Sequence, residues 1–329
     1  MPRAVLVTGA GGFLGSHLVE RLVARGDQVR ALVRYNSRGD RGCLEHLSPG
    51  VLAKLEVLHG DLTDPFFTRR AVDGCAVVFH LAALISIPYS YTAAAQVFLS
   101  NVQGALHVAQ ACLDARVGRL VHTSTSEVYG TAQRVPIAET HPLVAQSPYA
   151  ASKIAADQCV QSFHRAFGLQ AVTVRPFNTY GPRQSARAVL PTLITQALTR
   201  PELRVGSLHP TRDLNYVADT VEGFVLAAEA SDASGAVGGT FNLATGREIT
   251  MGDLAQRVLR LTGKSLPITQ DPARMRPSAS EVERLCGDAS RAREVLGWAP
   301  AVTLDQGIAR TVEYISTHLH RYRPEEYQV

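Results

Sequence analysis

The sequence predicts an α/β protein with a doubly wound parallel sheet and a smaller second lobe. Short β-branched runs alternate with helical patterns through the first half of the chain. A glycine-rich turn separates the first strand from the first helix. After Pro176 the chain changes to shorter segments punctuated by proline and glycine. We therefore expect a first unit over residues 1–176 and a smaller α/β lobe over residues 177–329.

The expected strands are short, apolar and rich in β-branched residues, at positions 4–8, 29–33, 56–59, 77–80, 119–123 and 171–175. The expected helices each carry an apolar face, at positions 15–24, 102–115, 150–167, 190–198, 219–228 and 251–261. The run GGTFNLAT at residues 238–245 has the pattern of one more buried strand. The chain is therefore expected to return to the main sheet within residues 214–246, so that the two lobes are interleaved.

Charge and composition argue against several classes of protein. The formal net charge is +4, and basic residues are scattered among acids, so nucleic-acid binding is not indicated. The 5 cysteines lack the spacing of zinc ligands, so we expect reduced thiols and no metal site. No charged leader precedes the first strand and no apolar run approaches about 20 residues, so we expect no membrane segment and a cytoplasmic location.

Three glycines shape the turn after the first strand, in VLVTGAGGFLG. Gly9 lets the chain turn tightly, Gly12 lets the backbone approach a pyrophosphate, and Gly15 lets strand and helix pack closely. The N–H groups at the start of the helix, including those of Phe13 and Leu14, then point toward an anion. This arrangement predicts a dinucleotide site on a sheet of the Rossmann type.

Residues that follow the next three strands complete the expected cofactor site. Asp61 and Leu62 come after the third strand, near the adenine, while Ala82 and Ala83 leave room for the cofactor after the fourth. The second strand ends in Arg34 and offers no acid for a ribose diol, and an arginine here accommodates a 2′-phosphate. The expected cofactor is therefore NADP or NAD, with NADP favoured.

A tyrosine and a lysine one helical turn apart are the candidate catalytic pair. Tyr149 and Lys153 share one face at the start of the third expected helix. We expect the ammonium and the charge of the cofactor to lower the pKa of Tyr149, so that the phenol exchanges a proton with a substrate hydroxyl. Thr125, at the end of the preceding strand, completes the set.

The chain resembles the extended short-chain dehydrogenases that epimerise, dehydrate or decarboxylate nucleotide sugars. The resemblance rests on TGAGGFLG, on the Thr125, Tyr149 and Lys153 set and on RPFNTYGPR, and it extends from Val5 to about Trp298. It implies a homodimer in which the second and third expected helices pair across a two-fold axis. Because guanidinium groups pair well with phosphate oxygens, it also implies a set of substrate contacts. These are Ser86, Asn178, Arg183, Arg212 and Arg276.

The residues after Thr125 bear on the reaction. Glu127 is placed to remove a carbon-bound proton, as an elimination requires, although a glutamate here also has the simpler role of capping the strand. In the glucose-nucleotide dehydratases an aspartate stands where this chain has Ser126. The Thr-Ser-Glu run instead resembles GDP-mannose 4,6-dehydratases and also occurs in UDP-glucuronate decarboxylases.

Longer segments favour one reaction among these. TSTSEVYGTA, SPYAASKIAAD, RPFNTYGPRQSARAVLP and RPSASEVERL are most similar to the N-acetylglucosamine-nucleotide dehydratases of legionaminic-acid-type pathways. We therefore expect a 4,6-dehydratase for a UDP- or GDP-linked N-acetylglucosamine-type sugar, with a tightly bound cofactor because hydride is taken from C4 and returned to C6. UDP-glucuronate decarboxylase and nucleotide-sugar 4-epimerase stay open as alternatives, and a non-catalytic dinucleotide sensor is a remote one.

Overall fold

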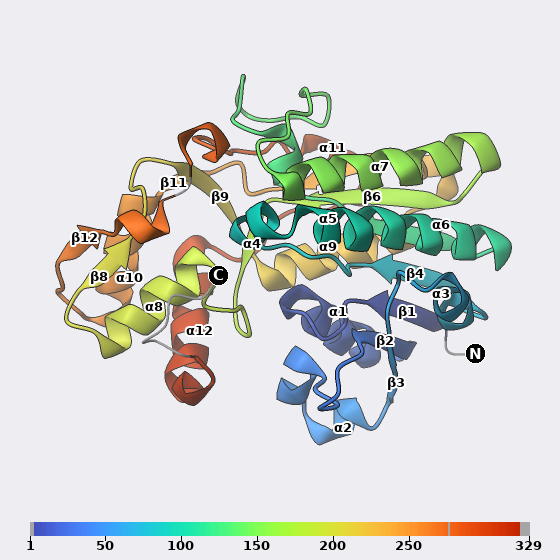
Figure 1. The fold of residues 1–329 in the computed structure, drawn as a ribbon, viewed down its shortest axis with the longest axis horizontal. Coiled ribbons are helices and arrows are strands. Elements are labelled where there is room, and N and C mark those ends of the chain that lie inside the picture. Colours follow the sequence, from blue (N-terminus) through green and yellow to red (C-terminus); the bar gives the residue numbers. More distant parts are fainter. Residues whose placement is uncertain (1–2, 276, 323–329) are drawn as a thin grey trace.

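A parallel sheet of seven strands forms the centre of the protein in this computed structural model, which describes residues 3–275 and 277–322. The strand order is β10-β6-β5-β4-β1-β2-β3, so the chain starts near the middle and winds outward in both directions (Figure 1). The strands are β1 (Ala4–Thr8), β2 (Gln28–Arg34), β3 (Leu55–Gly60), β4 (Val77–His80), β5 (Arg119–Thr123), β6 (Ala171–Pro176) and β10 (Thr240–Leu243). The expected doubly wound α/β fold is confirmed.

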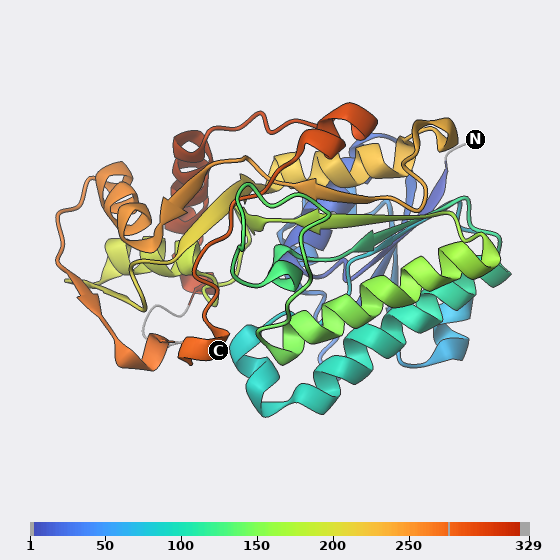
Figure 2. The same ribbon diagram turned by 90° about the horizontal axis from the view of Figure 1, so that it is seen from above.

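Helices cover both faces of this sheet. α1 (Phe13–Ala24) and α9 (Val217–Glu229) pack together on one face, while α6 (Gly104–Asp114) and α7 (Pro148–Phe167) lie side by side on the other (Figure 2). Successive side chains of β1 enter different apolar clusters, one on each face, because side chains alternate along a strand. The remaining helices of this half are α2 (Pro49–Leu52), α3 (Pro65–Val72), α4 (Ile87–Thr92) and α5 (Ala94–Phe98).

Local signals set the start and the end of α7. The Ser147 hydroxyl accepts a hydrogen bond from the Ala150 backbone nitrogen, and Pro148 is the first helical residue. The helix ends at Gly168, whose φ of +73° is left-handed. Because α7 begins two residues before the expected start, Tyr149 lies inside its first turn.

The helix expected at 102–115 is longer than predicted, because α5 continues through a π-helical turn (Leu99–Gln103) into α6. The wide turn buries Asn101, which is 2% exposed. Its side chain accepts a hydrogen bond from the Leu84 nitrogen at 2.7 Å and donates to the Leu84 oxygen at 3.0 Å and to Ser152 Oγ at 2.9 Å. The π turn thereby joins the loop after β4 to α7.

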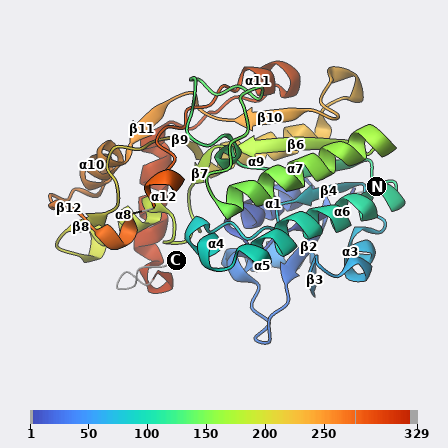
Figure 3. The same cartoon turned by 45° about the horizontal axis from the view of Figure 1, so that its top comes forward.

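The second lobe packs beside the carboxyl end of the sheet (Figure 3). Its strands β11, β9 and β7 form one small sheet, and β12 pairs with β8. Their bounds are β7 (Asn178–Tyr180), β8 (Leu203–Val205), β9 (Thr211–Tyr216), β11 (Glu248–Thr250) and β12 (Ile268–Gln270). The helices of this part are α8 (Val189–Thr199), α10 (Met251–Thr262) and α12 (Leu304–Thr317), whereas α11 (Ser290–Leu296) packs against β10 and α9.

The chain crosses between the two parts more than once. β10 pairs in parallel with β6, with Phe241 opposite Val174, so the strand expected at 238–245 does join the main sheet. The buried Trp298 then donates a hydrogen bond from Nε1 to the Asp219 oxygen on α9 at 2.7 Å. Among residues 3–275 and 277–322, we find no helix with the length and apolar content needed to cross a bilayer.

Candidate active site

The turn between β1 and α1 has no room for side chains at two of its glycines. A Cβ atom on Gly9 would lie 2.8 Å from the Ala82 nitrogen, and one on Gly15 would lie 2.2 Å from the Gly9 oxygen. Gly9 also has a φ of +70°, which favours glycine. In the described part of the chain no side chain caps the start of α1, so the N–H groups of its first turn are available to an anion.

A cavity of about 510 Å³ begins at this turn and follows the carboxyl ends of the strands. Apart from the catalytic pair, its lining contains every residue that the sequence predicts for the cofactor: Gly9, Gly12, Phe13, Leu14, Gly15, Arg34, Asp61, Leu62, Ala82 and Ala83. The residues therefore fit an extended dinucleotide. A larger cavity of about 1400 Å³ lies between α10, β11 and residues 300–305, and its lining includes none of the predicted site residues.

The loop after β2 forms a wall of the cofactor cavity that the sequence analysis missed. Its lining residues are Asn36, Asp40, Arg41 and Gly42. The Cys43 nitrogen donates a 2.8 Å hydrogen bond to the Gly11 oxygen, which holds this loop against the glycine turn. The glycine and asparagine content of the loop indicates a turn, but the sequence does not show which surface that turn meets.

Arg34 and Asp61 face each other across one end of this cavity. Arg34 Nε lies 3.5 Å from Asp61 Oδ2, with both side chains partly exposed. Asp61 also accepts hydrogen bonds of 2.9 Å from the backbone nitrogen and the hydroxyl of Thr63. The carboxylate is therefore fixed in place beside the guanidinium, and a 2′-phosphate entering here would meet a negative charge as well as a positive one.

Tyr149 and Lys153 lie on one face of α7 and are 7% and 4% exposed. Lys153 Nζ donates a 2.6 Å hydrogen bond to the Thr123 oxygen at the end of β5. Burial lowers the pKa of Lys153 to about 8, although the Asp157 carboxylate raises it. Burial raises the pKa of Tyr149 well above its ordinary value, while a hydrogen bond with Thr125 lowers it. In the chain itself burial therefore raises the pKa of Tyr149, in contrast to the expected lowering by the lysine.

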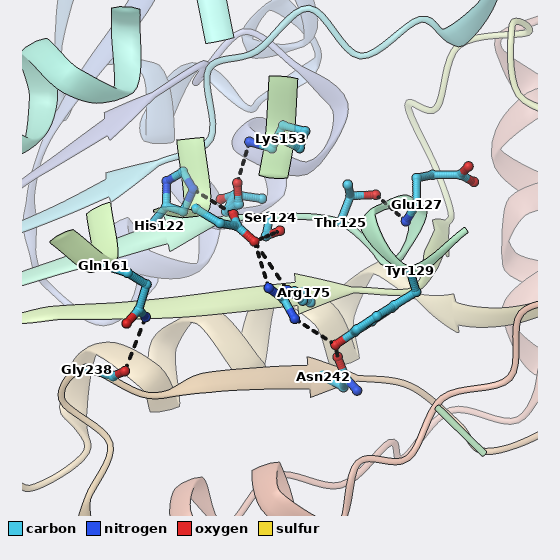
Figure 4. Close-up of polar contacts among 12 residues, drawn as sticks. His122, Ser124, Thr125, Glu127, Tyr129, Lys153, Gln161, Arg175, Gly238 and Asn242 are labelled. Atoms are coloured by element: carbon cyan, nitrogen blue, oxygen red, sulfur yellow. Dashed lines mark hydrogen bonds and ion pairs between the residues drawn. The ribbon is translucent and has the colours of Figure 1, made fainter. Parts of the chain in front are cut away.

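The strand end carries the other predicted catalytic residues. Thr125 Oγ1 accepts a 3.2 Å hydrogen bond from the Glu127 nitrogen and begins a short 3-10 turn, η3 (Ser126–Tyr129). Ser126 and Glu127 are 2% and 8% exposed. The Glu127 carboxylate is close enough to Tyr149 to raise the pKa of that phenol. Thr125, Glu127, Tyr149 and Lys153 therefore all lie near the end of β5. Figure 4 shows Thr125, Glu127 and Lys153.

Two of the predicted substrate residues lie on paired strands of the second lobe, β7 and β9. Asn178 opens β7, and its Oδ1 is buried without a hydrogen-bond partner among the described residues. Arg212 on β9 donates a 2.7 Å hydrogen bond to the Val282 oxygen and lies 3.1 Å from Glu281 Oε1. Ser86 caps α4 by accepting a hydrogen bond from the Tyr89 nitrogen. The unpaired oxygen of Asn178 fits a ligand donor.

Arg183, another predicted substrate contact, makes its side-chain hydrogen bonds with α1 in this structure. Its Nη2 is 2.6 Å from Glu20 Oε2 and its Nη1 is 3.4 Å from Ser16 Oγ, both on α1. On the same helix, His17 Nε2 makes a 2.9 Å hydrogen bond with the Pro182 oxygen. Through these contacts the Arg183 guanidinium joins the segment after β7 to α1. Arg276, the remaining predicted contact, lies outside the described residues.

The structure also shows a buried polar network that the sequence analysis did not identify. Asp157 is 1% exposed and contacts His122, Ser124 and Arg175. Ser124 directly precedes Thr125, and Asp157 lies one turn beyond Lys153 on the same face of α7. Tyr149, Lys153 and Asp157 are spaced four residues apart, and this spacing predicts that the three side chains share one face of the helix. The same spacing does not reveal the partners of Asp157.

Known proteins resemble this chain over nearly its whole length. The family model "GDP-mannose 4,6 dehydratase" matches residues 6–311. A UDP-glucose 4-epimerase of Mycolicibacterium smegmatis is 36% identical over 318 residues, which cover 94% of this chain and 97% of that protein. UDP-glucuronic acid decarboxylase 1 of Arabidopsis thaliana is 33% identical, over 94% of this chain and 68% of that protein.

A solved structure shares the fold throughout. The dTDP-glucose 4,6-dehydratase of Streptomyces venezuelae, with NAD bound, has a TM-score of 0.86 and 30% sequence identity, covering 98% of this chain and 100% of that chain. Similar proteins thus include dehydratases, epimerases and decarboxylases. The chain belongs to the GDP-mannose 4,6-dehydratase family, the nucleotide-sugar dehydratases and epimerases of the extended short-chain dehydrogenase class.

Proposed function

We propose that this protein is a 4,6-dehydratase that converts a UDP- or GDP-linked N-acetylglucosamine-type sugar to its 4-keto-6-deoxy product. The observation that carries this proposal is the position of Glu127. This residue is buried, lies two residues after Thr125 in η3, and is close to Tyr149. An elimination needs a base for the C5 proton in addition to the pair that oxidises C4. The longer sequence segments similar to legionaminic-acid-type dehydratases support the sugar class.

The residues of the site divide the chemistry among them. Tyr149 removes the proton of the sugar O4, helped by its hydrogen bond with Thr125. The Lys153 ammonium stabilises the phenolate and is itself held by the Thr123 oxygen. Once C4 is a ketone the C5 hydrogen is acidic, so Glu127 removes it as a proton and passes that proton to the C6 hydroxyl, which leaves as water. A bound nicotinamide cofactor supplies the hydride acceptor at C4 and the hydride donor at C6.

NAD fits this site better than NADP, contrary to the preference based on Arg34 alone. The Asp61 carboxylate, 3.5 Å from Arg34 and anchored by Thr63, offsets the positive charge that a 2′-phosphate requires. The structural relative from Streptomyces venezuelae holds NAD. Because the reaction has no net redox change, we propose that NAD stays tightly bound between turnovers.

We propose that Arg212 binds the substrate diphosphate and that Asn178 contacts the sugar or its phosphates. Arg212 is largely buried and keeps its charge at any relevant pH. The unpaired oxygen of Asn178 supports a contact with a ligand donor. Ser86 and Arg276 remain proposed contacts on the family resemblance alone. Arg183 also stays a proposed contact on the family resemblance, and in this structure it contacts Glu20 and Ser16.

We further propose a homodimer formed through α6 and α7. The helical stretch formed by the π turn and α6 exposes Leu99 and Leu106, which are 50% and 40% exposed. A cytoplasmic location is supported by the unpaired cysteines, which form no disulfide in the described residues. For the lobes we propose the division 1–176 and 177–329, with the return within 214–246.

A product analysis in deuterated water tests the proposed reaction. The protein is incubated with UDP, GDP and dTDP sugars, and products are followed by NMR. A 4,6-dehydratase yields a 4-keto-6-deoxy sugar with deuterium at C5, because the proton removed there is replaced from solvent. An inverted C4 without deuterium indicates a 4-epimerase, and release of carbon dioxide from UDP-glucuronate indicates a decarboxylase. Cofactor binding without any product would indicate a sensor. Each of these last three results overturns the proposal.

A further inference from the structure

Asp157 is the centre of a buried network, and Figure 4 shows its partners His122, Ser124 and Arg175. Its Oδ2 accepts a 2.6 Å hydrogen bond from Ser124 Oγ and lies 3.0 Å from Arg175 Nη2 and 3.3 Å from Arg175 Nε. Its Oδ1 lies 3.1 Å from His122 Nε2, which must carry the proton to donate to a carboxylate. The carboxylate thus joins α7 to the ends of β5 and β6.

The network continues from Arg175 toward the edge of the sheet. Arg175 Nη1 donates to the Tyr129 hydroxyl at 3.0 Å, and that hydroxyl donates to Asn242 Oδ1 on β10 at 2.7 Å. Arg175 is 5% exposed, so both charges of the ion pair with Asp157 have been removed from water. Such a pair often adds little net stability, because desolvation costs about as much as the attraction returns. A stability argument alone therefore does not account for it.

The carboxylate is placed to act on two members of the catalytic set. Through Ser124 it holds the residue that directly precedes Thr125. It also lies one helical turn from Lys153 on the same face of α7. We propose that Asp157 is a positioning residue, which fixes the strand end bearing Thr125 and supplies the negative charge that keeps the Lys153 side chain an ammonium. This inference rests on the proposed function, since it concerns the same catalytic set.

Charged and titratable groups from several elements face Lys153 and Asp157. Burial lowers the pKa of His80 on β4 and of His122 on β5, so both rings are neutral near pH 7. On β6, Arg175 is a permanent cation. Tyr149 lies on α7 itself, and Glu127 in η3 acts on Tyr149. Burial alone would raise the pKa of Asp157, but the His122 hydrogen bond and the Arg175 charge keep it below its ordinary value, so the carboxylate is ionised.

Removing the negative charge of Asp157 should change the pKa of Lys153 in one direction only. Burial already lowers the pKa of Lys153 to about 8, and Asp157 is the group that opposes the fall. In Asp157→Asn the remaining neighbours include the Arg175 cation, so the pKa of Lys153 should fall further, by about one unit or more. Partial unfolding would have the opposite effect, because a solvated lysine titrates near 10.4. The direction of the shift therefore separates a lost charge from a loosened fold.

The composition of the chain makes this titration simple to follow. Its lysines are Lys54, Lys153 and Lys264, and the first and last are exposed. Protein labelled with ¹³C at lysine Cε is titrated by NMR in the presence of NAD, and Lys153→Met assigns the buried signal. The exposed lysines serve as internal controls. No sugar substrate is needed, so the result is independent of whether the proposed reaction is right.

Two variants separate the two parts of the inference. In Asp157→Asn we expect the Lys153 midpoint to fall and, where turnover occurs, the alkaline limb of the kcat profile to move down with it. In Ser124→Ala the carboxylate and its charge remain, so the Lys153 midpoint should stay within about 0.3 units. The loss of the bond to the strand end should still lower kcat by roughly tenfold.

An unchanged or raised Lys153 midpoint in a folded Asp157→Asn protein overturns the electrostatic role. Equal falls in Asp157→Asn and Ser124→Ala overturn it as well, because the shift would not then depend on charge. If Asp157→Asn does not fold, Asp157→Glu keeps the charge and should leave the midpoint near the wild-type value, and a fall there contradicts the inference. Wild-type kcat in Ser124→Ala overturns the positioning role.

Discussion

Lys153 Nζ donates a 2.6 Å hydrogen bond to the carbonyl oxygen of Thr123, so the ammonium is anchored to the end of the strand that leads to Thr125. This contact fixes the lysine independently of any ligand. It also turns the ammonium toward the strand end, where Thr123 lines the cofactor cavity. The face of α7 that carries Tyr149 and Lys153 is thereby held in a fixed position relative to β5 before a substrate binds.

The first prediction separates oxidation from elimination. Tyr149→Phe removes the group that takes the O4 proton, so both the product and the transient reduced cofactor should disappear. Glu127→Gln keeps the size and polarity of the side chain but cannot accept the C5 proton, and product formation should fall by roughly a hundredfold or more. Reduced cofactor should then accumulate, as measured by near-ultraviolet absorbance after mixing with substrate. Wild-type product rates in Glu127→Gln would exclude Glu127 as the elimination base.

The second prediction concerns the glycine turn. Gly15→Ala places a Cβ atom 2.2 Å from the Gly9 oxygen, and the backbone must shift to relieve this contact. We expect a loss of about 1–3 kcal/mol in unfolding free energy, together with weaker NAD binding. Gly50→Ala is the matched control, since no described atom lies within 4 Å of its added Cβ, and it should be within about 0.5 kcal/mol of wild type. Denaturant unfolding and calorimetric NAD titration measure both, and equal stabilities of the two variants would refute the crowding argument.

The third prediction concerns cofactor choice. Asp61→Asn keeps the hydrogen bonds to Thr63 but removes the negative charge beside Arg34. The ratio of the Kd for NADP to the Kd for NAD should therefore fall, by roughly tenfold for one close charge. Arg34→Asp has the reverse effect, because it removes a cation and adds a repelling charge. Titration calorimetry with both cofactors measures these ratios. Ratios that stay constant in both variants would show that Arg34 and Asp61 do not face the ribose.

The fourth prediction links His17 to acid stability. Burial lowers the pKa of His17 from 6.5 to about 4, with a contribution from Arg183. Between these values the unfolded chain binds a proton that the folded chain does not, so stability falls as the pH decreases from 6.5 to 4. In His17→Gln, which retains a donor for the Pro182 oxygen, this loss should be smaller by about 3 kcal/mol at pH 4. Denaturant unfolding across this range measures the slope, and identical slopes would contradict the prediction.

The fifth prediction concerns assembly. Light scattering should give a dimer mass at micromolar protein concentration. Leu106→Glu places a charge on the proposed α6 surface and should give a monomer, since a buried unpaired charge costs several kcal/mol. Phe66→Glu, at a 75% exposed residue of α3, is the control and should remain a dimer. A monomeric wild-type protein would end the proposal.

Much of the fold followed from local patterns. The strands of the main sheet were predicted to within a residue of β1 to β6, because each is a short β-branched run between turn signals. The cofactor residues were also predicted, since the carboxyl ends of parallel strands meet at one edge and the glycine spacing marks that edge. Helix spacing likewise placed Tyr149 and Lys153 on one face.

The tertiary structure decided the contacts between distant residues. Arg183 meets Glu20, which is 163 positions away, a contact that its motif does not reveal. Asp157 meets Ser124, 33 positions away, and only the packing of α7 on β5 brings them together. The pKa of Tyr149 follows from burial rather than from the neighbouring lysine. Sequence spacing thus determined which residues share a face, whereas the chain's packing determined what each face meets and how much water each polar group keeps.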